Sequence, residues 1–401
     1  MSKVIVIGGG PAGMMSAIAA AKNNEVILIE KNKELGKKLK ITGGGRCNIT
    51  NIRDIEDFLG KIIKNPKFLY SSLYTFTNLD LLEFFKNRGI EFKTEEDYKV
   101  YPEKDKSDII IKALQDELNE VGVKIIYEKT LMDIIVENEE IKGVILDDDY
   151  TIKADKVIIA TGGHSYPKTG SDGKIHSILK KHGENITKIY PALVPLVFNE
   201  DWIKNLQGIS LKNVKVSTKY FKNKKISIEG DILFAHFGLT GPVILNLSSY
   251  INKYLQDGNI ELNFDFVPTI TKDEVRKVIR KNSNKSIYNN LKEILPVNFT
   301  KHLLEYLNID KKPNNLTKEE ENKIVDSIKE LKLNCSGTKS INESIVTSGG
   351  ISVKSIDSST MESKTIKNLY YAGEVIDIEG LTGGYNLQIA FSTGYLAGIS
   401  V

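Results

Sequence analysis

VIVIGGGPAGMMSAIAAAKNNEVILIE, residues 4–30, decides the fold of this chain. An apolar run that suits a buried strand, 4–7, leads into the pattern G-x-G-x-x-G at Gly8, Gly10 and Gly13. A small, apolar, helix-favouring stretch follows, and a second apolar run, 26–29, ends in Glu30. Strand, glycine turn, helix, strand and acid in this order are typical of a dinucleotide-binding unit. The sequence therefore predicts an α/β protein with a Rossmann-like domain at its start.

Each residue of this unit has a physical role. Gly8 permits the tight turn, Gly10 lets the backbone approach a pyrophosphate, and Gly13 lets the helix pack on the strand. The helix N-terminus, at Pro11 and Ala12, offers free N–H groups and the positive end of a dipole to the phosphates. Glu30 is placed to accept hydrogen bonds from a ribose diol.

Length and composition limit the interpretation. A chain of 401 residues exceeds the usual single-core size of about 250–300 residues, so several domains are expected. The net charge of +3 does not by itself imply nucleic acid. Cys47 and Cys335 are too far apart to indicate a disulfide framework or a metal cluster, which suits a reducing cytoplasm. The histidines form no H-x-x-x-H pair, and no apolar run reaches the roughly 18 residues of a membrane span. Because the chain opens on a strand of the fold, no cleaved signal is expected.

Changes of pattern along the chain predict its domains. Residues 1–190 read as the first part of the nucleotide-binding domain, with 31–51 as a loop rich in Gly and Lys. Short alternating strands with polar turns predict a β-rich insert over 191–268 and about 333–345. Residues 269–332 have a helical pattern with a break at Pro-Asn-Asn, 313–315. The last part, 346–401, returns to the nucleotide-binding domain.

GKKLKITGGGRCNITN, 36–51, holds three consecutive glycines among basic residues. Consecutive backbone N–H groups in a glycine run make an anion-binding nest. A flexible surface loop is the alternative, but the position directly after a dinucleotide unit favours contact with the cofactor. The residues assigned to it here are Lys38, Gly43, Gly44, Gly45, Arg46 and Asn48.

Two further segments indicate the cofactor. KVIIATGG, 156–163, is a buried strand that ends in Thr161, Gly162 and Gly163, where small residues let a ligand lie close. YYAGEVIDIEGLTGGYNLQIAFSTG, 370–394, sets Glu374 after a strand and then starts a helix near Gly384. The acid is placed to bind the ribityl and phosphate side of a flavin, and the helix N-terminus suits the flavin edge where charge grows on reduction. Together these segments favour FAD over a tightly held nicotinamide, through Gly373, Glu374, Gly384, Tyr385, Asn386 and Leu387.

Four side chains are candidates for catalysis, each with a structural alternative. Cys47 beside a flavin can donate a proton or form an adduct, or it is a small packed residue. His164 can donate a proton or serve as a hydrogen-bonding loop residue. Tyr166 can stack on a ring or belong to the core. His236, in GDILFAHFGLTGPVIL at 230–245, lies in a segment that faces either substrate or a domain junction, with a helix expected after Pro242.

The motifs GGGPAG, GKKLKITGGGRCNITN, TGGHSYPKTGSDG, GDILFAHFGLTGP, SGGI, TMESK and YYAGEVIDIEGLTGGYNLQIAFSTG occur in this order. Over essentially the whole chain they resemble bacterial NAD(P)/FAD-dependent oxidoreductases of the BaiN/RdsA type. The resemblance implies a glutathione-reductase-like FAD domain, a β-barrel-like insert and a helical cap. The chain departs from the family pattern at His164, where members often carry an apolar residue.

Carried over by match, the resemblance implies that FAD contacts Gly8, Gly10, Gly13, Glu30, Lys31, Gly44, Arg46, Cys47, Asn48, Thr161, Gly162, Gly373, Glu374, Gly384, Asn386 and Leu387. No second G-x-G-x-x-G is evident, so NADH or NADPH is expected to bind transiently as the electron donor. Family members are linked to dihydrouridine synthesis in ribosomal RNA, to reduction of steroid enones in bile-acid metabolism, and to oxidation of aminoacetone.

Two basic segments bear on the choice of substrate. Lys212 to Lys225 carries six lysines with no acid between them, and Tyr220 and Phe221 lie inside the run. Lys272 to Lys292 adds further cations against Asp273 and Glu274. Cations that follow phosphates, with aromatic residues for stacking, are typical of RNA binding. A solvated lysine face in a lysine-rich proteome is the alternative. The first hypothesis is a reductase that forms dihydrouridine in 23S ribosomal RNA; a steroid-enone reductase, an amine oxidase and a flavin-carrying assembly factor stay open.

Overall fold

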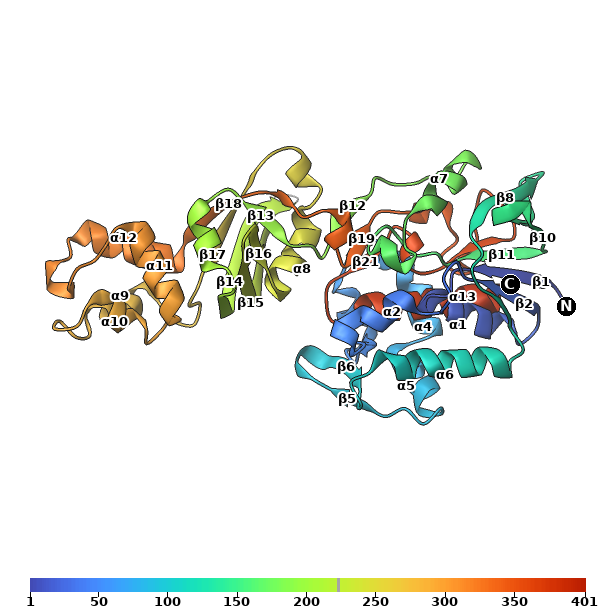
Figure 1. Ribbon diagram of the computed structural model, residues 1–401, viewed down its shortest axis with the longest axis horizontal. Helices are drawn as coiled ribbons and strands as arrows, with labels where there is room; N and C mark the ends of the chain where they lie inside the picture. The colour runs from blue at the N-terminus through green and yellow to red at the C-terminus, as the bar shows by residue number, and fades with distance from the viewer. Residues whose placement is uncertain (222–223) are drawn as a thin grey trace. The chain divides into compact units, whose positions relative to one another are not determined.

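The computed structural model describes residues 1–221 and 224–401 and divides them into two compact units (Figure 1). The first unit comprises Met1–Tyr190 and Ile345–Val401, and the second comprises Pro191–Ser344. Of the predicted basic run, Lys222 lies outside the described residues, as do the side chains of 220, 221 and 224. None of the helices in the described part of the chain is long and apolar enough to cross a membrane.

A five-stranded parallel sheet forms the centre of the first unit. Its order is β20-β11-β1-β2-β7, and the strands are β1 (Lys3–Ile7), β2 (Glu25–Ile29), β7 (Lys124–Ile126), β11 (Lys156–Ile159) and β20 (Leu369–Tyr371). The apolar runs 4–7 and 26–29 are buried throughout, as expected for parallel strands that are covered on both faces. The carboxyl ends of β1 and β11 therefore lie side by side, which brings the first glycine turn next to the segment after Ile159.

Helices α1 (Pro11–Ala20) and α13 (Tyr385–Ser400) pack against each other, although they come from opposite ends of the chain (Figure 1). The contact is between backbones, because a Cβ at Gly394 would lie 2.4 Å from Ala12 O and one at Gly398 would lie 2.5 Å from Ser16 O. A Cβ at Gly373 would similarly lie 2.8 Å from the Cβ of Ala12. The closing segment of the chain is thus held against the start of the first helix.

Smaller elements complete the first unit. Its other helices are α2 (Lys37–Ile41), α3 (Ile55–Leu59), α4 (Tyr70–Thr75), α5 (Asn78–Lys86), α6 (Ser107–Glu120) and α7 (Lys174–Lys181). Its other strands are β3 (Thr50–Asn51), β4 (Ile62–Lys64), β5 (Phe92–Thr94), β6 (Lys99–Pro102), β8 (Leu131–Glu137), β9 (Glu140–Leu146), β10 (Thr151–Lys153), β19 (Val346–Ser348) and β21 (Glu379–Gly380), and β12 (Tyr190–Ala192) spans the boundary between the units.

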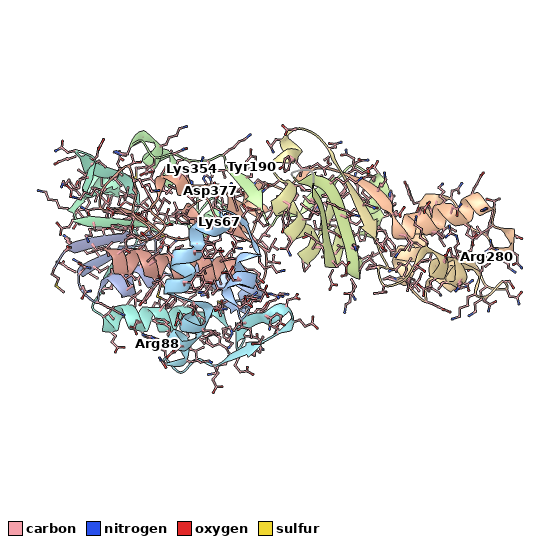
Figure 2. The ribbon with its side chains drawn as sticks, turned by 180° about the vertical axis from the view of Figure 1, so that it is seen from behind. Lys67, Arg88, Tyr190, Arg280, Lys354 and Asp377 are labelled. Atoms are coloured by element: carbon pink, nitrogen blue, oxygen red, sulfur yellow. The ribbon has the colours of Figure 1, made fainter. Side chains whose placement is uncertain are left out.

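Ion pairs join some of these elements. Arg88, just after α5, donates from Nε to Oε2 of Glu117 on α6, at 2.8 Å (Figure 2). Asp377 is almost fully buried, and its carboxylate pairs with Lys64 of β4 at 2.6 Å (Figure 2). Residues 31–51, expected as a loop, contain α2, because the apolar Leu39 is buried on one side of that short helix.

A closed six-stranded barrel forms the second unit. Its order is β13-β16-β15-β14-β17-β18, from β13 (Leu196–Phe198), β14 (Ser210–Phe221), β15 (Lys224–Ala235), β16 (Gly238–Thr240), β17 (Ile260–Asp265) and β18 (Leu331–Thr338). Two of these strands have 12 residues each, where the sequence predicted only short strands. Register shifts interrupt their pairing after Leu211 and after Thr218, so the regular alternation in the sequence is broken. Helix α8 (Pro242–Ile251) begins at Pro242, as its sequence favours.

Four helices lie between β17 and β18 in sequence: α9 (Lys272–Arg280), α10 (Ile287–Leu291), α11 (Val297–Leu307) and α12 (Lys318–Lys329). They share one hydrophobic core with the barrel, since the Phe299 ring of α11 lies 5.9 Å from that of Phe234 in β15 and 4.7 Å from that of Phe266. The predicted helical stretch 269–332 therefore belongs to the same compact unit as the barrel.

Candidate active site

The turn between β1 and α1 gives each motif glycine a distinct steric environment. Gly8 has φ +105°, and a Cβ there would lie 2.5 Å from Ala160 O. A Cβ at Gly13 would lie 1.8 Å from Gly8 O, so the helix can pack on the turn only if residue 13 has no side chain. A Cβ at Gly10 would meet nothing within 4 Å. Gly10 therefore faces an open cradle at the N-terminus of α1, where a pyrophosphate can approach the backbone.

Glu30 closes the second strand onto this turn. Its Oε2 accepts a hydrogen bond from the Gly9 N–H (2.7 Å), and its Oε1 accepts from the backbone and side-chain amides of Asn32 (2.7 Å each). The side chain of the neighbouring Lys31 pairs with Asp172 at 3.1 Å. Glu30 is thus fixed beside the glycine turn, and contact with a ribose stays a prediction.

The segment after β11 lies against the same turn. A Cβ on Gly8 would be 3.0 Å from Thr161 Cα, so the two loops touch through their backbones. The Thr161 hydroxyl is buried and has no hydrogen-bond partner among the described residues. A buried polar atom without a partner is costly, so this hydroxyl fits a site whose ligand supplies the missing bond. Gly162 has φ +77°. A Cβ on Gly163 would lie 2.4 Å from Thr347 Oγ1.

The glycine run 43–45 adopts left-handed backbone conformations, with φ of +58°, +68° and +89°. A Cβ on Gly44 would meet nothing within 4 Å, so this loop also presents an open backbone. Cys47 follows at φ +62° and donates its backbone N–H to Thr42 O at 3.0 Å. A non-glycine residue held in this region indicates a conformation that the surroundings impose.

Hydrogen bonds join this loop to the start of α13. In the orientation that satisfies its neighbours, the Asn48 amide accepts from Gly384 N–H at 3.1 Å. Asn51 donates to Gly383 O at 3.1 Å, and Thr50 donates to Gln388 Oε1 at 2.6 Å. The structure therefore brings together two predicted cofactor segments that lie more than 300 positions apart in sequence.

The first residues of α13 use their side chains for contacts within the protein. The Asn386 side chain accepts from Gly380 N–H and donates to Gly380 O, both at 2.9 Å, which holds the preceding loop. The Tyr385 ring packs edge-on against Phe58 with centroids 4.8 Å apart, and the Leu387 side chain is packed against the core. What these residues offer to a ligand is thus the N-terminus of the helix rather than their side chains.

Arg46 points toward a group of acids. Its guanidinium pairs with Glu95 and with Asp105, the latter at 2.8 Å, and lies 4.2 Å from the centroid of the Tyr101 ring. The hydrogen bonds that Arg46 donates to these two carboxylates raise its pKa above the ordinary value. A cavity of about 410 Å³ lined by Glu95, Glu96, Lys99 and Tyr101 adjoins this cluster. Contact of Arg46 with FAD stays a prediction.

Cys47 is completely buried. Burial raises the pKa of its thiol to about 12, and the hydrogen bond with Thr42 offsets this only in part. The side chain therefore carries its proton near neutral pH, which does not favour the thiolate chemistry of a flavin adduct. Proton donation and simple packing both stay open for this residue.

A largely buried ion pair between Lys38 and Glu374 connects several segments of the first unit. Lys38 Nζ lies 2.6 Å from Glu374 Oε2 and donates to Ser165 Oγ at 2.6 Å. Ser165 Oγ and the Thr347 N–H donate to the other oxygen of Glu374, at 2.9 and 2.8 Å. Burial alone would raise the pKa of Glu374, but Lys38 and these donors outweigh it and hold the pKa below its usual value. The carboxylate predicted to bind the flavin side chain thus also holds Lys38 and the loop at Ser165.

The remaining catalytic candidates are distributed over both units. His164 lies beside His176 of α7, with 2.9 Å between His164 Nε2 and His176 Nδ1. Tyr166 has φ +53°, and its ring centroid is 5.9 Å from Lys38 Nζ. His236 belongs to the second unit, in the turn between β15 and β16, with its ring against Phe237.

Sequence reasoning missed several partners of these residues. Ser165, which holds Glu374, lies inside the motif TGGHSYPKTGSDG but was given no role, and Thr347 and His176 lie outside the quoted motifs. Only the closeness of His176 to the Gly173 turn was visible in the sequence, and the pairing itself depends on the fold. Among residues 1–221 and 224–401, no group of three or more His, Cys, Asp or Glu side chains is arranged to hold a metal ion.

These features fit a dinucleotide: an open cradle at Gly10 on a helix N-terminus, an unpartnered Thr161 hydroxyl, an open glycine loop, and a second helix N-terminus at α13. Solved structures show which fold the chain shares. A flavocytochrome c3 fumarate reductase in its open conformation matches all of this chain and 78% of its own, with a TM-score of 0.53 and 16% identity. The 3-ketosteroid-Δ4-(5α)-dehydrogenase of Rhodococcus jostii matches all of this chain and 96% of its own, with a TM-score of 0.53 and 14% identity. The fold is the Rossmann-like FAD-binding fold with a β-barrel insert.

The family follows from sequence comparison. The family model described as HI0933-like protein Rossmann domain matches residues 2–400. The 3-dehydro-bile acid delta(4,6)-reductase of Clostridium scindens is 30% identical over 99% of this chain and 98% of its own length. The ribosomal RNA dihydrouridine synthase of Haemophilus influenzae is 29% identical over all of this chain and 98% of its own. The chain belongs to the HI0933-like family of FAD-dependent oxidoreductases.

Proposed function

We propose that this protein uses FAD, reduced by NADH or NADPH, to saturate an activated carbon–carbon double bond, and that its substrate is a uridine of 23S ribosomal RNA. The observation that carries the proposal is similarity over the whole length, barrel unit included, to ribosomal RNA dihydrouridine synthases of Haemophilus influenzae and Escherichia coli. Dihydrouridine differs from uridine by two hydrogens across the C5=C6 bond, which is conjugated with a carbonyl. The proposed reaction therefore adds a hydride and a proton to one double bond.

Different residues of the first unit would bind different parts of the cofactor. Gly10 and the N-terminus of α1 would hold the pyrophosphate, Thr161 would donate or accept beside it, and Glu30 would bind the ribose. When bound, FAD supplies hydride chemistry. The backbone N–H groups at the start of α13 and in loop 43–45 are preorganised donors for negative charge, which stabilise charge without having to reorient.

Charges on the barrel support an RNA substrate. Lys212, Lys219 and Lys225 on the hairpin β14–β15 are exposed, and no ion pair involves them within the described residues. Lys215 on the same hairpin pairs with Glu229 at 3.2 Å. Exposed cations without acidic partners are free to neutralise phosphates, which is the main contribution to RNA affinity. Unstacking a uridine costs a few kcal/mol, and such phosphate contacts can offset it.

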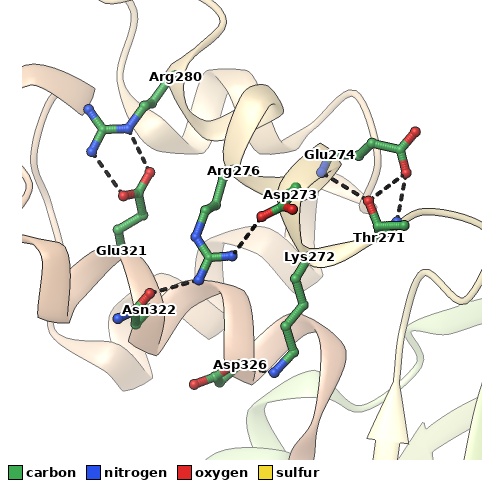
Figure 3. A network of polar contacts seen from close by, with 9 residues as sticks. All are labelled: Thr271, Lys272, Asp273, Glu274, Arg276, Arg280, Glu321, Asn322 and Asp326. Carbon is green, nitrogen blue, oxygen red and sulfur yellow. Dashed lines mark hydrogen bonds and ion pairs between the residues drawn. The ribbon is translucent and has the colours of Figure 1, made fainter.

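The second basic segment has a different role (Figure 3). Lys272 pairs with Asp326 and Glu330 of the α12 region at 2.8 Å each, and Arg280 pairs with Glu321 of α12 at 2.7 Å. Arg276 donates to Asn322 at 2.8 Å and pairs with Asp273 at 3.5 Å. Most cations of α9 are therefore used to fasten it to α12. We accordingly assign RNA contact to the hairpin lysines rather than to Lys272–Lys292.

The proposal is tested by measuring dihydrouridine in 23S ribosomal RNA by mass spectrometry, in the parent organism, in a strain that lacks the gene, and after the gene is restored. The expected result is a site that loses dihydrouridine in the deletion strain and regains it on complementation. Unchanged dihydrouridine in the deletion strain would contradict the RNA substrate.

A steroid enone is the second candidate, because the bile-acid reductase of Clostridium scindens is 30% identical over 99% of this chain. The same hydride and proton additions would then act on a small, free, conjugated ketone. The activity is tested by incubating the purified protein with a 3-oxo-Δ4,6 bile acid without oxygen and measuring the rate at which NADH or NADPH is oxidised. Rapid turnover with the steroid and none with ribosomal RNA would favour the second candidate.

A further inference from the structure

Two histidines and one carbonyl form an unbranched hydrogen-bonded chain at the edge of the candidate site. His176 on α7 is buried, and its Nε2 lies 3.2 Å from Val375 O. Its Nδ1 lies 2.9 Å from His164 Nε2, and the two rings are nearly parallel, at 6°. Val375 directly follows Glu374, so the chain ends on the segment that also carries the Lys38 ion pair.

This geometry fixes the tautomer of both rings. A carbonyl oxygen only accepts, so Nε2 of His176 must carry a hydrogen and donate it to Val375 O. Nδ1 of neutral His176 then has a lone pair and accepts from Nε2–H of His164. The remaining nitrogen of His164, Nδ1, has no hydrogen-bond partner among the described residues. When His164 becomes an imidazolium, the added proton therefore binds to Nδ1. Because Nε2–H is donated to His176, Nδ1 is the position from which a proton can be transferred to another group.

The surroundings keep His164 in this position. An ideal Cβ on Gly173, which has φ +71°, would lie 2.1 Å from the His164 ring, so the ring fills the space that a side chain would need. The His164 N–H also donates to Thr347 Oγ1 at 2.7 Å. His164 belongs to the same short loop as Thr161, whose buried hydroxyl has no hydrogen-bond partner among the described residues, and Ser165, which holds Lys38.

The charges around the pair set the protonation of both rings. Burial lowers the pKa of His164 below its usual value, while the nearby carboxylates of Asp172 and Glu374 act in the opposite direction. Burial lowers the pKa of His176 to about 4, so this ring stays neutral near neutral pH. Asp172 is itself paired with Lys31 (3.1 Å) and Lys174 (3.8 Å), and Glu374 is paired with Lys38.

We propose that in this chain, which carries His164 where family members often have an apolar residue, His164 is the proton donor of the reduction, and that His176 is the positioning residue that directs the transferable proton to His164 Nδ1. The inference rests on the proposed function, in which the substrate is a conjugated double bond. One carbon receives the hydride; the other gains a C–H bond as the Nδ1–H bond of the His164 imidazolium breaks. The electron pair of that bond stays on Nδ1, leaving a neutral imidazole, and solvent returns the proton before the next cycle.

Three other proton-bearing side chains of the first unit are less suited to this step. The Cys47 thiol is fully buried, and its pKa of about 12 makes it a weak acid. Lys38 and Ser165 are bound to Glu374. An efficient general acid needs a pKa near the working pH, and of these groups a histidine has the ordinary pKa nearest to it, although burial lowers that of His164.

The first test is nitrogen NMR of the imidazole rings in the FAD-loaded protein, across a pH series. Expected for His164 is a hydrogen on Nε2 and none on Nδ1 in the neutral form, and titration of Nδ1 with a pKa below the usual histidine value. In His176→Leu the fixed tautomer should be lost. A wild-type protein in which Nδ1 of neutral His164 carries the hydrogen would overturn the proposal, whatever the substrate is.

The second test follows oxidation of the pre-reduced holoprotein by 23S ribosomal RNA from the deletion strain, without oxygen. His164→Gln should lower this rate by about 100-fold or more. The wild-type rate should fall as pH rises above the His164 pKa, because the imidazolium form is then lost, and the variant should lack this dependence. Added imidazole should partly restore His164→Ala. The matched control is His182→Gln, which should keep the wild-type rate. The His182 ring pairs with Asp133 at 2.7 Å and takes no part in the hydrogen bonds between His164 and His176.

The outcomes separate the two proposals. A wild-type protein that transfers nothing to the RNA contradicts the proposed substrate and with it the role of His164 in that reaction. An active wild type with His164→Gln at the same rate and the same pH profile contradicts the histidine proposal alone. A loss in His164→Gln that affects only RNA affinity, with the maximal rate unchanged, also contradicts it.

Discussion

Ion pairs have different roles in the two units. In the first unit Lys38 and Glu374 are three-quarters or more buried, and the neighbours that contact them, Ser165 and Thr347, come from different segments of the chain. In the second unit the half-exposed Arg280 pairs with the buried Glu321 of α12, Arg276 donates to Asn322 of the same helix, and these contacts hold one helix on another. Charge in the first unit therefore shapes a site, whereas charge on α9 and α12 supports a fold, and basic composition alone does not distinguish the two.

The largest loss of stability is expected at Gly13, where α1 packs on the glycine turn with no free space. In Gly13→Ala the new Cβ would lie 1.8 Å from Gly8 O, so α1 must move off the turn. We expect a loss of about 3 kcal/mol in the free energy of unfolding, with loss of bound FAD. Urea unfolding and the flavin content of the purified protein measure both.

Gly10→Ala is the matched control. Its Cβ meets nothing within 4 Å and its backbone is extended, so the fold should be unchanged while FAD is displaced. A Gly10→Ala protein that keeps full FAD affinity would contradict the position of the cradle.

Lys38→Met removes the cation from a buried carboxylate. We expect a loss of about 2 kcal/mol at pH 7, because Glu374 is left without its partner. The pKa of Glu374 lies below its ordinary value of 4.5, so its contribution to stability is present above that value and lost as pH falls through the folded-state pKa. The difference between wild type and variant, from urea unfolding, should therefore shrink as the pH falls from 7 through the folded-state pKa of Glu374. A difference that stays constant over the whole acid titration of the protein would contradict this account.

The hairpin lysines should affect RNA binding without affecting stability. In the triple variant Lys212→Gln, Lys219→Gln, Lys225→Gln we expect weaker binding of 23S ribosomal RNA. The slope of log affinity against log salt should fall by about 0.7–0.9 for each phosphate that is no longer neutralised. Filter binding over a salt series measures it. Glutamine at Lys86, Lys153 and Lys180, exposed lysines of the first unit, is the control of equal charge, and an equal loss there would contradict a role specific to the hairpin.

The smallest effect is expected on the helices of the second unit. Arg280→Met breaks the pair with Glu321 and should lower stability by less than Lys38→Met does, since the arginine side chain is half exposed. FAD content and RNA affinity should be unchanged. A fall in RNA affinity with unchanged stability would show that α9 contacts the RNA after all.

Part of this architecture was predictable from sequence because it depends on single residues. Gly8 and Gly13 each meet a steric requirement of the fold that no other residue meets, Gly10 leaves the cradle open, and the first domain could be read from this pattern. The partners of Glu374 and His164 could not be predicted, since Ser165, Thr347 and His176 come from other segments of the chain and meet these residues only in the folded protein. The long hairpin was missed because its two bulges interrupt the alternation that marks strands.

The basic segments show a further limit. Lys215 and Lys272 look alike in sequence next to Lys212 and Lys219, yet both have acids beside them in the fold. Glu229 is in the neighbouring strand and Asp326 in a helix over 50 positions away. Which cations are free for a partner depends on such distant pairings, and the sequence does not show them.

The central claim, flavin-dependent saturation of a uridine, is tested most directly by stoichiometry. The holoprotein is reduced with one equivalent of NADH or NADPH without oxygen and mixed with 23S ribosomal RNA from the deletion strain; flavin absorbance and dihydrouridine are then measured together. The account predicts one dihydrouridine for each flavin reoxidised. Flavin that stays reduced in the presence of the RNA, or is reoxidised with no dihydrouridine formed, would contradict it.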